Sequence, residues 1–494
     1  MASEFADIQG LLRSGYSNLV QACYLLVRVT DRAAARAWLS SAPITTAAEG
    51  SVSTLLQVAL TADGMRSLGV AEQIVAGFSP EFQSGMAGQE GRSRRLGDIG
   101  ASAPSRWRWG AYWVPDVLMM LAARTGLSSW REQVVTDLFG RGFEILEELA
   151  TSDMHGKEPF GFVDGVSQPQ LDWDGKRRPG TSADLEYGNL IAVGEFLLGY
   201  RNEYGLYTDR PLLDPALDGA VDLPVAEDDP SRRDLGRNGS YLVFRELHQN
   251  VRGFWRFVAE QAQSLDESTR LAEAMVGRRL SGGPLIAGNH HIRGVGDRNR
   301  DIRLNGFTYD GDQGGIVCPI GAHVRRANPR TGDMPGGRQG WIAWLNRTIG
   351  LFQPDLQDDL VAASRFHRIL RRGREFGMSM TMEEAMRPDA TDPRSGLHFL
   401  CLNANISRQF EFIQNAWLMS SKFARLSGES DPIIGNREPL LSGQPTDTFS
   451  LPQPNGVARR LAGMPQFVTV AGGAYFFLPG VRALRYLAGA PPAS

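Results

Sequence analysis

The 494-residue chain has few cysteines, and this scarcity excludes several kinds of site. The three cysteines, Cys23, Cys318 and Cys401, are far apart and form no CxxC pair. An odd number of distant cysteines argues against a disulfide framework and a structural zinc site, and it fits a reducing compartment. The chain also lacks a GxSxG motif, a Walker loop and a GxGxxG motif that opens a helix.

Long apolar runs and an excess of one charge are also missing. Fifty-two lysines and arginines stand against 55 aspartates and glutamates, so the formal net charge of −3 favours neither nucleic acid nor an anionic membrane. Residues 1–18 lack the apolar core of a signal peptide, and the longest apolar runs, such as 117–123, are too short to cross a bilayer. We therefore predict a cytoplasmic protein without membrane or nucleic-acid partners, and we leave homo-oligomer formation open.

The chain does contain two strand–helix patterns that each occur twice. Residues 21–42 predict a strand and then an amphipathic helix capped by Asp31, and residues 239–262 repeat that order. Residues 116–139 and 397–420 each predict an apolar strand, a polar break and a helix. The repetition predicts a duplicated α+β fold, with antiparallel sheets covered by helices. Chance recurrence of strand–helix pairs is the alternative.

The segment between the two repeats, residues 206–240, is rich in proline, aspartate and glycine. It has little periodicity and is typical of a long surface loop that joins domains. The predicted domains are therefore 1–235 and 236–494. Near the other end of the chain, residues 465–480 predict a hairpin that turns at Gly472 and Gly473.

An aspartate, Asp164, lies in an unusually apolar and glycine-rich setting in EPFGFVDGVSQPQ, residues 158–170. An Asp-Gly turn is one interpretation, because aspartate often bonds its own backbone there. The other is that Gly161 and Gly165 let the backbone approach a ligand toward which Asp164 points. Taken alone, the stretch is more typical of the turn.

Of the seven histidines, His323 has the most suggestive surroundings, because it lies in CPIGAHVRRANPR and is followed by three arginines. Imidazole binds metals, and arginine binds carboxylates through two parallel hydrogen bonds. A core histidine beside a solvated basic face is the alternative. A second arginine group, in HRILRRGREFG, follows the apolar pair Ile369-Leu370, which favours an inward-facing Arg371.

The sequence offers no second histidine or cysteine at the spacing of a zinc site. A cofactor that needs a single axial protein ligand fits this inventory, and haem is such a cofactor.

Four segments together resemble the longer branch of the dye-decolorizing peroxidases: GFVDGVSQP, CPIGAHVRRANPR, RILRRGREFG and GLHFLCLNANISRQFEFIQ. The resemblance runs from DIQGLLRSGYSNL to FVTVAGGAYFFLPG, nearly the whole chain. It implies a duplicated ferredoxin-like fold, two antiparallel sheets flanked by helices and related to dimeric α+β barrels, with haem b in the C-terminal half. It also implies a peroxidase that reduces hydrogen peroxide and oxidises dyes and phenols through compound I.

The resemblance further implies a role for each matching residue. Asp164 would be the distal acid–base group, Arg371 the distal arginine and His323 the proximal ligand of the haem iron. The remaining implied pocket residues are Arg330 as the partner of a haem propionate, Leu397 and Phe399 as apolar residues above the haem, and Asp431 as the acid that bonds the proximal histidine, with Glu429 and Glu411 as fallbacks. Gly373 replaces an asparagine of shorter members, which leaves Asp164 and Arg371 as the polar distal pair.

Two other functions stay open at this point. One is a haem-binding or haem-handling protein with incidental peroxidase activity, and the other is a non-haem protein whose arginine clusters bind a polyanion. If the chain is a peroxidase, a distal pocket lined by Leu397 and Phe399 is too narrow for an anthraquinone. We therefore predict that bulky dyes are oxidised at the surface, with Trp341 and Trp344 as candidate exit points.

Overall fold

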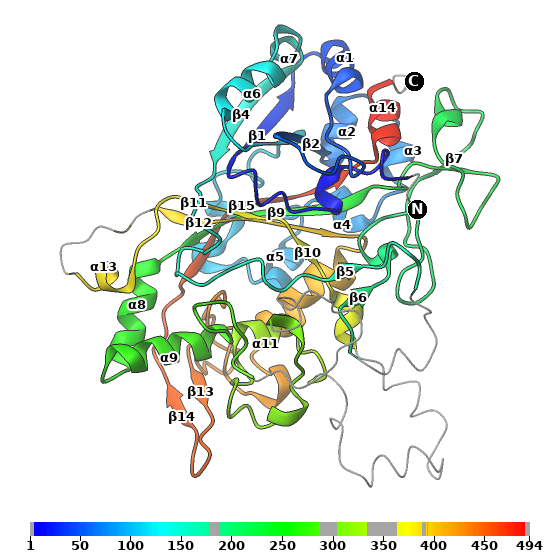
Figure 1. Cartoon of the computed structure of the whole chain (residues 1–494). Helices are drawn as coiled ribbons and strands as arrows, with labels where there is room; N and C mark the ends of the chain where they lie inside the picture. Colours follow the sequence, from blue (N-terminus) through cyan, green and yellow to red (C-terminus); the bar gives the residue numbers. More distant parts are fainter. Residues whose placement is uncertain are drawn as a thin grey trace, which may run out of the picture.

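The computed structural model describes residues 4–176, 187–286, 304–332, 363–387, 392 and 394–489. The N-terminal half builds an antiparallel group of strands in the order β2-β3-β1-β4 (Figure 1). These strands are β1 (Gln21–Val29), β2 (Thr54–Leu60), β3 (Val117–Ala123) and β4 (Phe143–Ala150).

The C-terminal half builds a second antiparallel group in the order β10-β12-β9-β15, with β11 also paired to β12. These strands are β9 (Ser240–Gln249), β10 (Leu370–Arg371), β11 (Arg374–Phe376), β12 (Ser395–Asn403) and β15 (Val468–Leu478). The two groups meet where Phe477 of β15 pairs with Leu60 of β2, so eight strands follow one path from β10 to β4, and β11 is the ninth strand of the sheet, off this path.

The two halves have the same internal order, which confirms the predicted duplication of the fold. If β10 and β11 are counted together as the second strand of the C-terminal half, the first strand of each half lies between the third and the last: β1 between β3 and β4, and β9 between β12 and β15. Each first strand is followed by a helix, α1 (Arg32–Ser41) or α8 (Val251–Glu260). Asp31 caps α1 by accepting from the backbone N–H of Ala34, as predicted.

The third strand of each half also leads into helical structure. β3 leads into α6 (Leu127–Val134) and α7 (Asp137–Gly142), and β12 leads into the wider helical turns η11 (Ser407–Glu411) and η12 (Ile413–Leu418). The other helices of the described chain are α2 (Ala62–Ser67), α3 (Glu72–Val75), α4 (Pro80–Ser84), α5 (Glu90–Leu96), α9 (Leu265–Val276), α11 (His323–Ala327), α13 (Met382–Met386) and α14 (Val481–Gly489). No described helix is long and apolar enough to pass through a bilayer.

Short strand pairs complete the described structure: β5 (Gln170–Leu171) with β6 (Leu190–Ile191), β7 (Leu212–Leu213) with β8 (Arg233–Asp234), and β13 (Phe449–Leu451) with β14 (Arg459–Leu461). The predicted hairpin at 465–480 is wrong, because β15 passes through Gly472 and Gly473 as one strand with a register shift beside Gly472. A Cβ atom at Gly472 would lie 2.4 Å from the indole nitrogen of Trp109. The glycine therefore makes room for a packed tryptophan.

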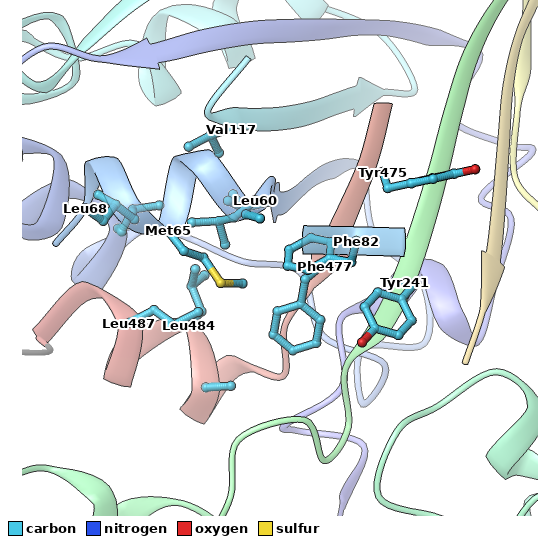
Figure 2. Packing of buried hydrophobic residues seen from close by; sticks show 14 of the residues in the cluster. Leu60, Met65, Leu68, Phe82, Val117, Tyr241, Tyr475, Phe477, Leu484 and Leu487 are labelled. Atoms are coloured by element: carbon cyan, nitrogen blue, oxygen red, sulfur yellow. The ribbon is translucent and has the colours of Figure 1, made fainter. Parts of the chain in front are cut away.

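One apolar core joins the two halves. Figure 2 shows Leu60 and Met65 of the N-terminal half beside Phe477, Leu484 and Leu487 of the C-terminal end. All five side chains are at most 1% exposed. The last helix, α14, thus packs against the first half of the chain.

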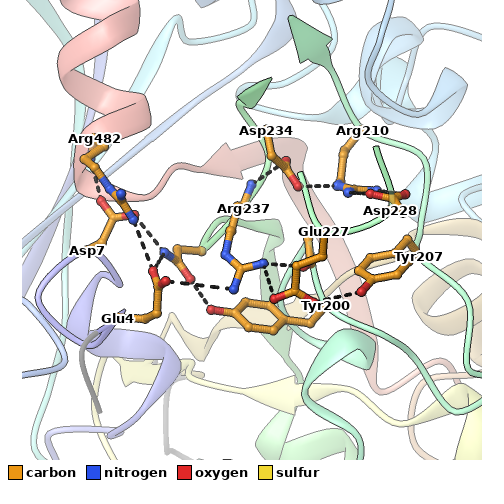
Figure 3. A network of polar contacts seen from close by, with 12 residues as sticks. Glu4, Asp7, Tyr200, Tyr207, Arg210, Glu227, Asp228, Asp234, Arg237 and Arg482 are labelled. Carbon is orange, nitrogen blue, oxygen red and sulfur yellow. Dashed lines mark hydrogen bonds and ion pairs between the residues drawn. The ribbon is translucent and has the colours of Figure 1, made fainter. Parts of the chain in front are cut away.

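The predicted surface loop at 206–240 is wrong in part, because several of its charged side chains are buried. Arg210 and Asp234, with 3% and 0% of their side chains exposed, form an ion pair at 2.6 Å (Figure 3). Arg237 pairs with Glu227 at 2.8 Å. The buried charges of this segment are paired with carboxylates or guanidinium groups of the same segment. A hydropathy pattern does not reveal such pairing, so it predicts an exposed loop.

Candidate active site

A cavity of about 280 Å³ lies against the C-terminal strands. This volume is near the lower end of the range of roughly 300–1,000 Å³ that is common for small-ligand sites. Its floor is one face of the sheet, where side chains alternate along each strand. Leu397 and Phe399 of β12 line the cavity, with Leu247 of β9 and Val470 of β15 beside them. The structure therefore brings both predicted apolar residues to the cavity.

His323, the first residue of α11, lines this cavity and is held by Asp431. Its ring nitrogen Nδ1 lies 3.0 and 3.1 Å from the two carboxylate oxygens of Asp431. Asp431 also accepts from the backbone N–H groups of Ile433 and Ile434, each at 2.9 Å. Because Nδ1 is occupied, Nε2 is the ring nitrogen that is free to bind a metal.

The electrostatics of Asp431 suit this task. Burial raises the pKa of Asp431, but His323, Arg326 and the backbone N–H of Ile434 together hold the pKa below the ordinary aspartate value. The carboxylate is thus ionised, which fixes the orientation of the imidazole ring. The two alternatives to Asp431 have other partners. Glu411 pairs with Arg92, and Glu429 accepts hydrogen bonds from the backbone N–H and the hydroxyl of Ser450.

Asp164 and Arg371 also line the cavity and form an ion pair, with Nη1 of Arg371 at 2.8 Å from Oδ1 of Asp164. The pair remains accessible, with 31% of the Arg371 side chain and 32% of the Asp164 side chain exposed. Burial raises the pKa of Asp164, but the charge of Arg371 and a backbone N–H bond lower it below the ordinary value. Asp164 is therefore a base that stays ionised in acid.

The sequence around Asp164 explains its position. Gly161 and Gly165 have φ angles of +99° and +72°, a backbone region that favours glycine. The side chain of Gln168 clamps β10, because it accepts from the backbone N–H of Arg371 at 3.0 Å and donates to its carbonyl at 3.2 Å. One short block therefore supplies Asp164 and also positions Arg371.

The lack of space around residue 373 explains why this position is a glycine. A Cβ atom there would lie 2.4 Å from the carbonyl oxygen of His398 on the neighbouring strand. A larger side chain has no room at this position unless the neighbouring strand shifts.

Arg330 is not among the described residues that line the cavity. It is buried, and its Nη1 donates to the carbonyls of Asn305 and Phe307 at 2.9 and 2.7 Å. Besides Arg245 and Arg371, which pair with carboxylates, two other arginines, Arg278 and Arg368, line the cavity. Both escaped the sequence analysis as individual residues, because a buried arginine has no pattern that separates it from a solvated one.

These three arginines leave positive charge unbalanced. None of Arg278, Arg330 and Arg368 forms an ion pair with a carboxylate in the part of the chain that the structure describes. Burial, followed by the charges of Arg330 and Arg371, lowers the pKa of Arg278 to about 10. A ligand with carboxylate groups would relieve this repulsion.

The donor set fits haem. The cavity offers an imidazole that is held by a carboxylate and has a free nitrogen, apolar walls, and buried arginines that lack anionic partners. Haem needs an axial ligand, an apolar slot and partners for two propionates. Among the described residues, no group of three or more His, Cys, Asp or Glu side chains could hold a metal ion by itself.

Three further cavity residues were missed by sequence reasoning: Glu158, Gln249 and His367. His367 stacks on Phe412 at 3.7 Å, and burial lowers its pKa to about 4. Trp341 and Trp344 lie outside the described residues, so oxidation of dyes at the surface stays a prediction.

No protein-family model matches the chain. It is 28% identical over 460 residues to a dye-decolorizing peroxidase of Mycetinis scorodonius, with 87% of this chain and 76% of the relative covered. It is 29% identical over 454 residues to a multifunctional dye peroxidase of an Amycolatopsis species, with 87% and 82% covered.

Solved structures give the same result. An ancestral D-type dye decolorizing peroxidase is 25% identical and superposes with a TM-score of 0.70, over 97% of this chain and 98% of that one. A DyP-type peroxidase of an Anabaena species, at 23% identity and a TM-score of 0.69, shares the fold over 98% and 95% of the two chains.

Proposed function

The chain belongs to the dye-decolorizing peroxidase family, and from this premise we propose that it is a haem b peroxidase that reduces hydrogen peroxide and oxidises dyes and phenols. One observation carries the proposal: an ionised Asp164–Arg371 pair and a histidine held by Asp431 face the same cavity.

The residues of the chain divide the work between binding and proton transfer. When bound, haem supplies an iron centre that takes up peroxide and stores its two oxidising equivalents. His323 would hold the iron through Nε2, and Asp431 would fix the orientation of the ring. Arg278 and Arg368 would meet the propionates, with Arg330 as a second layer of positive charge behind them.

Asp164 performs the proton transfer. Before its O–O bond breaks, peroxide must lose a proton from one oxygen and gain a proton on the other. An ionised Asp164 accepts the first proton and returns it to the second oxygen, which leaves as water. Arg371 stabilises the negative charge that develops there.

Two further proposals concern the boundary between the two halves and the cellular location of the protein. We place the boundary between the halves at 235/236, because the strand order restarts at β9. We propose a cytoplasmic location, which the three buried cysteines without disulfides support.

The proposal is tested by expressing the chain with added haem and recording the absorption spectrum and the turnover of an anthraquinone dye with peroxide. A Soret band with peroxide-dependent loss of dye colour is the expected result. A Soret band without turnover would instead favour haem handling, and the absence of a Soret band would favour polyanion binding.

A further inference from the structure

A second carboxyl group, Glu158, lies on the same cavity as Asp164. The two belong to one tight turn of the backbone. Lys157 and Val163 form an antiparallel bridge, the Asp164 N–H donates to the Gly156 carbonyl, and the Glu158 N–H donates to the Phe162 carbonyl. These contacts pair residues 156–158 with residues 162–164 as two short antiparallel segments. Because side chains alternate along such segments, Glu158, Phe162 and Asp164 lie on one face. The turn therefore presents two carboxyl groups side by side to the cavity.

The two carboxyl groups have different partners. Asp164 binds a cation, Arg371, at 2.8 Å. Glu158 binds neutral groups: the backbone N–H of Phe160 at 3.0 Å and of Phe162 at 2.9 Å, and the side-chain amide of Gln249 at 2.8 Å. No lysine or arginine of the described chain forms an ion pair with Glu158.

Gln249 is suited to serve Glu158 in both protonation states. Its amide NH₂ donates to the carboxylate, while its amide oxygen is buried and has no hydrogen-bond partner. A half-turn of the amide presents that oxygen to a protonated Glu158, which then donates its O–H. The backbone N–H groups of Phe160 and Phe162 favour the ionised form of Glu158, so Gln249 is the partner that can also accept a hydrogen bond from the protonated form.

The charges around the pair agree with this division. Burial raises the pKa of Glu158 to about 7, and the negative charge of Asp164 raises it further. The other charged or titratable groups near the pair are Arg371 on β10, Glu375 on β11, Arg278 after α9 and His323 on α11. Two neighbouring carboxyl groups whose pKa values are pushed apart are typical of an acid and a base that work together.

We propose that Glu158 is the proton reservoir of the cavity, which keeps a proton at neutral pH and passes it to Asp164. This inference rests on the proposed peroxidase function. Reduction of H₂O₂ to two water molecules consumes two electrons and two protons, and the oxidised dye or phenol supplies the electrons. The Glu158 O–H bond breaks, the proton moves through cavity water to Asp164 and from there to a peroxide-derived oxygen. Glu158 then takes a new proton from water. Glu158 thus acts through Asp164 as a positioning residue.

The kinetic test compares the haem-loaded wild type with Glu158→Gln and Glu375→Gln. Glu375 is a matched control, because burial and Asp164 also raise its pKa to about 7, but it is not among the described residues that line the cavity. At pH 5, Glu158→Gln should lower dye turnover about tenfold, less than the hundredfold of a directly acting acid–base group. Near pH 9 it should match the wild type, in which Glu158 is then ionised. Glu375→Gln should keep the wild-type fall in rate above pH 7.

Infrared difference spectra, recorded at pH 5 minus pH 9 on the haem-loaded protein, provide a readout that does not need activity. The C=O band of a protonated carboxyl should be present in Glu375→Gln and lose one component in the double variant Glu158→Gln/Glu375→Gln. An unchanged band would overturn the proposal, as would equal pH profiles for Glu158→Gln and the wild type. If no variant and no wild-type sample reacts with peroxide, the peroxidase function fails, and the infrared result still decides the protonation of Glu158.

Discussion

Two of the pairs at the cavity in which a carboxylate holds a nitrogen-containing side chain are built differently. In the Asp431–His323 pair the carboxylate is 0% exposed and accepts two backbone N–H groups besides the ring. In the Asp164–Arg371 pair both side chains are about one-third exposed to the cavity. The first, or fixed, pair has an enclosed carboxylate beside a histidine side chain that is 29% exposed, whereas the second, or open, pair exposes both of its side chains. This difference fits the proposed roles, in which the fixed pair positions a metal ligand and the open pair moves protons.

The largest effect is expected from removing the ring of the fixed pair. His323→Ala should lose the Soret band or most of the haem, because no other described cavity side chain offers a free nitrogen supported by a carboxylate. Absorption spectra after haem titration provide the measurement. His367→Ala is the matched control, since His367 also lines the cavity, and it should keep the haem. Full loading of His323→Ala with an unchanged ferric spectrum would contradict the assignment.

The cation of the open pair should have the next largest effect. Arg371→Leu removes the charge that stabilises the developing anion, so the reaction with peroxide should slow roughly a hundred- to a thousandfold at every pH. Arg371 also lowers the pKa of Asp164, so the fall in rate toward acid should persist and move to higher pH. Rapid-mixing haem absorbance measures both changes. A rate within twofold of the wild type would show that Arg371 has no electrostatic role.

A smaller effect is expected when the carboxylate of the fixed pair is made neutral. Asp431→Asn keeps the shape but weakens the hold on Nδ1 of His323, and residues that support a metal ligand typically contribute about ten- to a hundredfold in affinity. Haem transfer to apomyoglobin, followed by absorbance, measures the loss. Asp153→Asn is a control at a carboxylate that does not line the cavity. Equal transfer rates for Asp431→Asn and the wild type would remove Asp431 from this role.

The smallest effect concerns the backbone beside the open pair. Gly373→Ala places a Cβ atom against the carbonyl of His398, so the free energy of unfolding should fall by about 1–3 kcal/mol, as for other overpacked sites. The pH dependence of the peroxide reaction should keep its shape, because no titrating group changes. Denaturant unfolding and the pH series together test this. A lost acid limb in this variant would mean that the backbone position itself controls proton transfer.

Much of the fold could be predicted because local patterns and tertiary structure agree. The strand–helix repeats at 21–42 and 239–262 form β1–α1 and β9–α8, since apolar spacing alone specifies which faces are buried. The prediction failed at Gly472 and Gly473, where two glycines indicate a turn in sequence but accommodate Trp109 in the structure. It also failed where buried ion pairs, such as Arg210 with Asp234, replace apolar burial.

The candidate site shows the same limit. Asp164, His323, Arg371 and Asp431 were predicted, and the structure brings them to one cavity or into contact with it. Arg278 and Arg368 were missed, because the direction of an arginine side chain depends on packing that only the folded chain defines. Glu158 is the first residue of the segment 158–170 that contains Asp164. The separation of the two residues in the sequence does not reveal the turn that places them side by side.

The most direct test of the open pair is the pH dependence of the peroxide reaction in the Asp164→Asn variant. Haem absorbance after rapid mixing with peroxide should be followed from pH 7 to below the ordinary aspartate pKa of about 3.9. Because the pKa of Asp164 is lowered, the wild type should keep its rate until that acid range and then slow as Asp164 gains a proton. Asp164→Asn should react about a hundred- to ten-thousandfold more slowly near neutral pH and show no acid limb. A near wild-type rate with the acid limb intact would contradict the account and leave Arg371 as the main distal group.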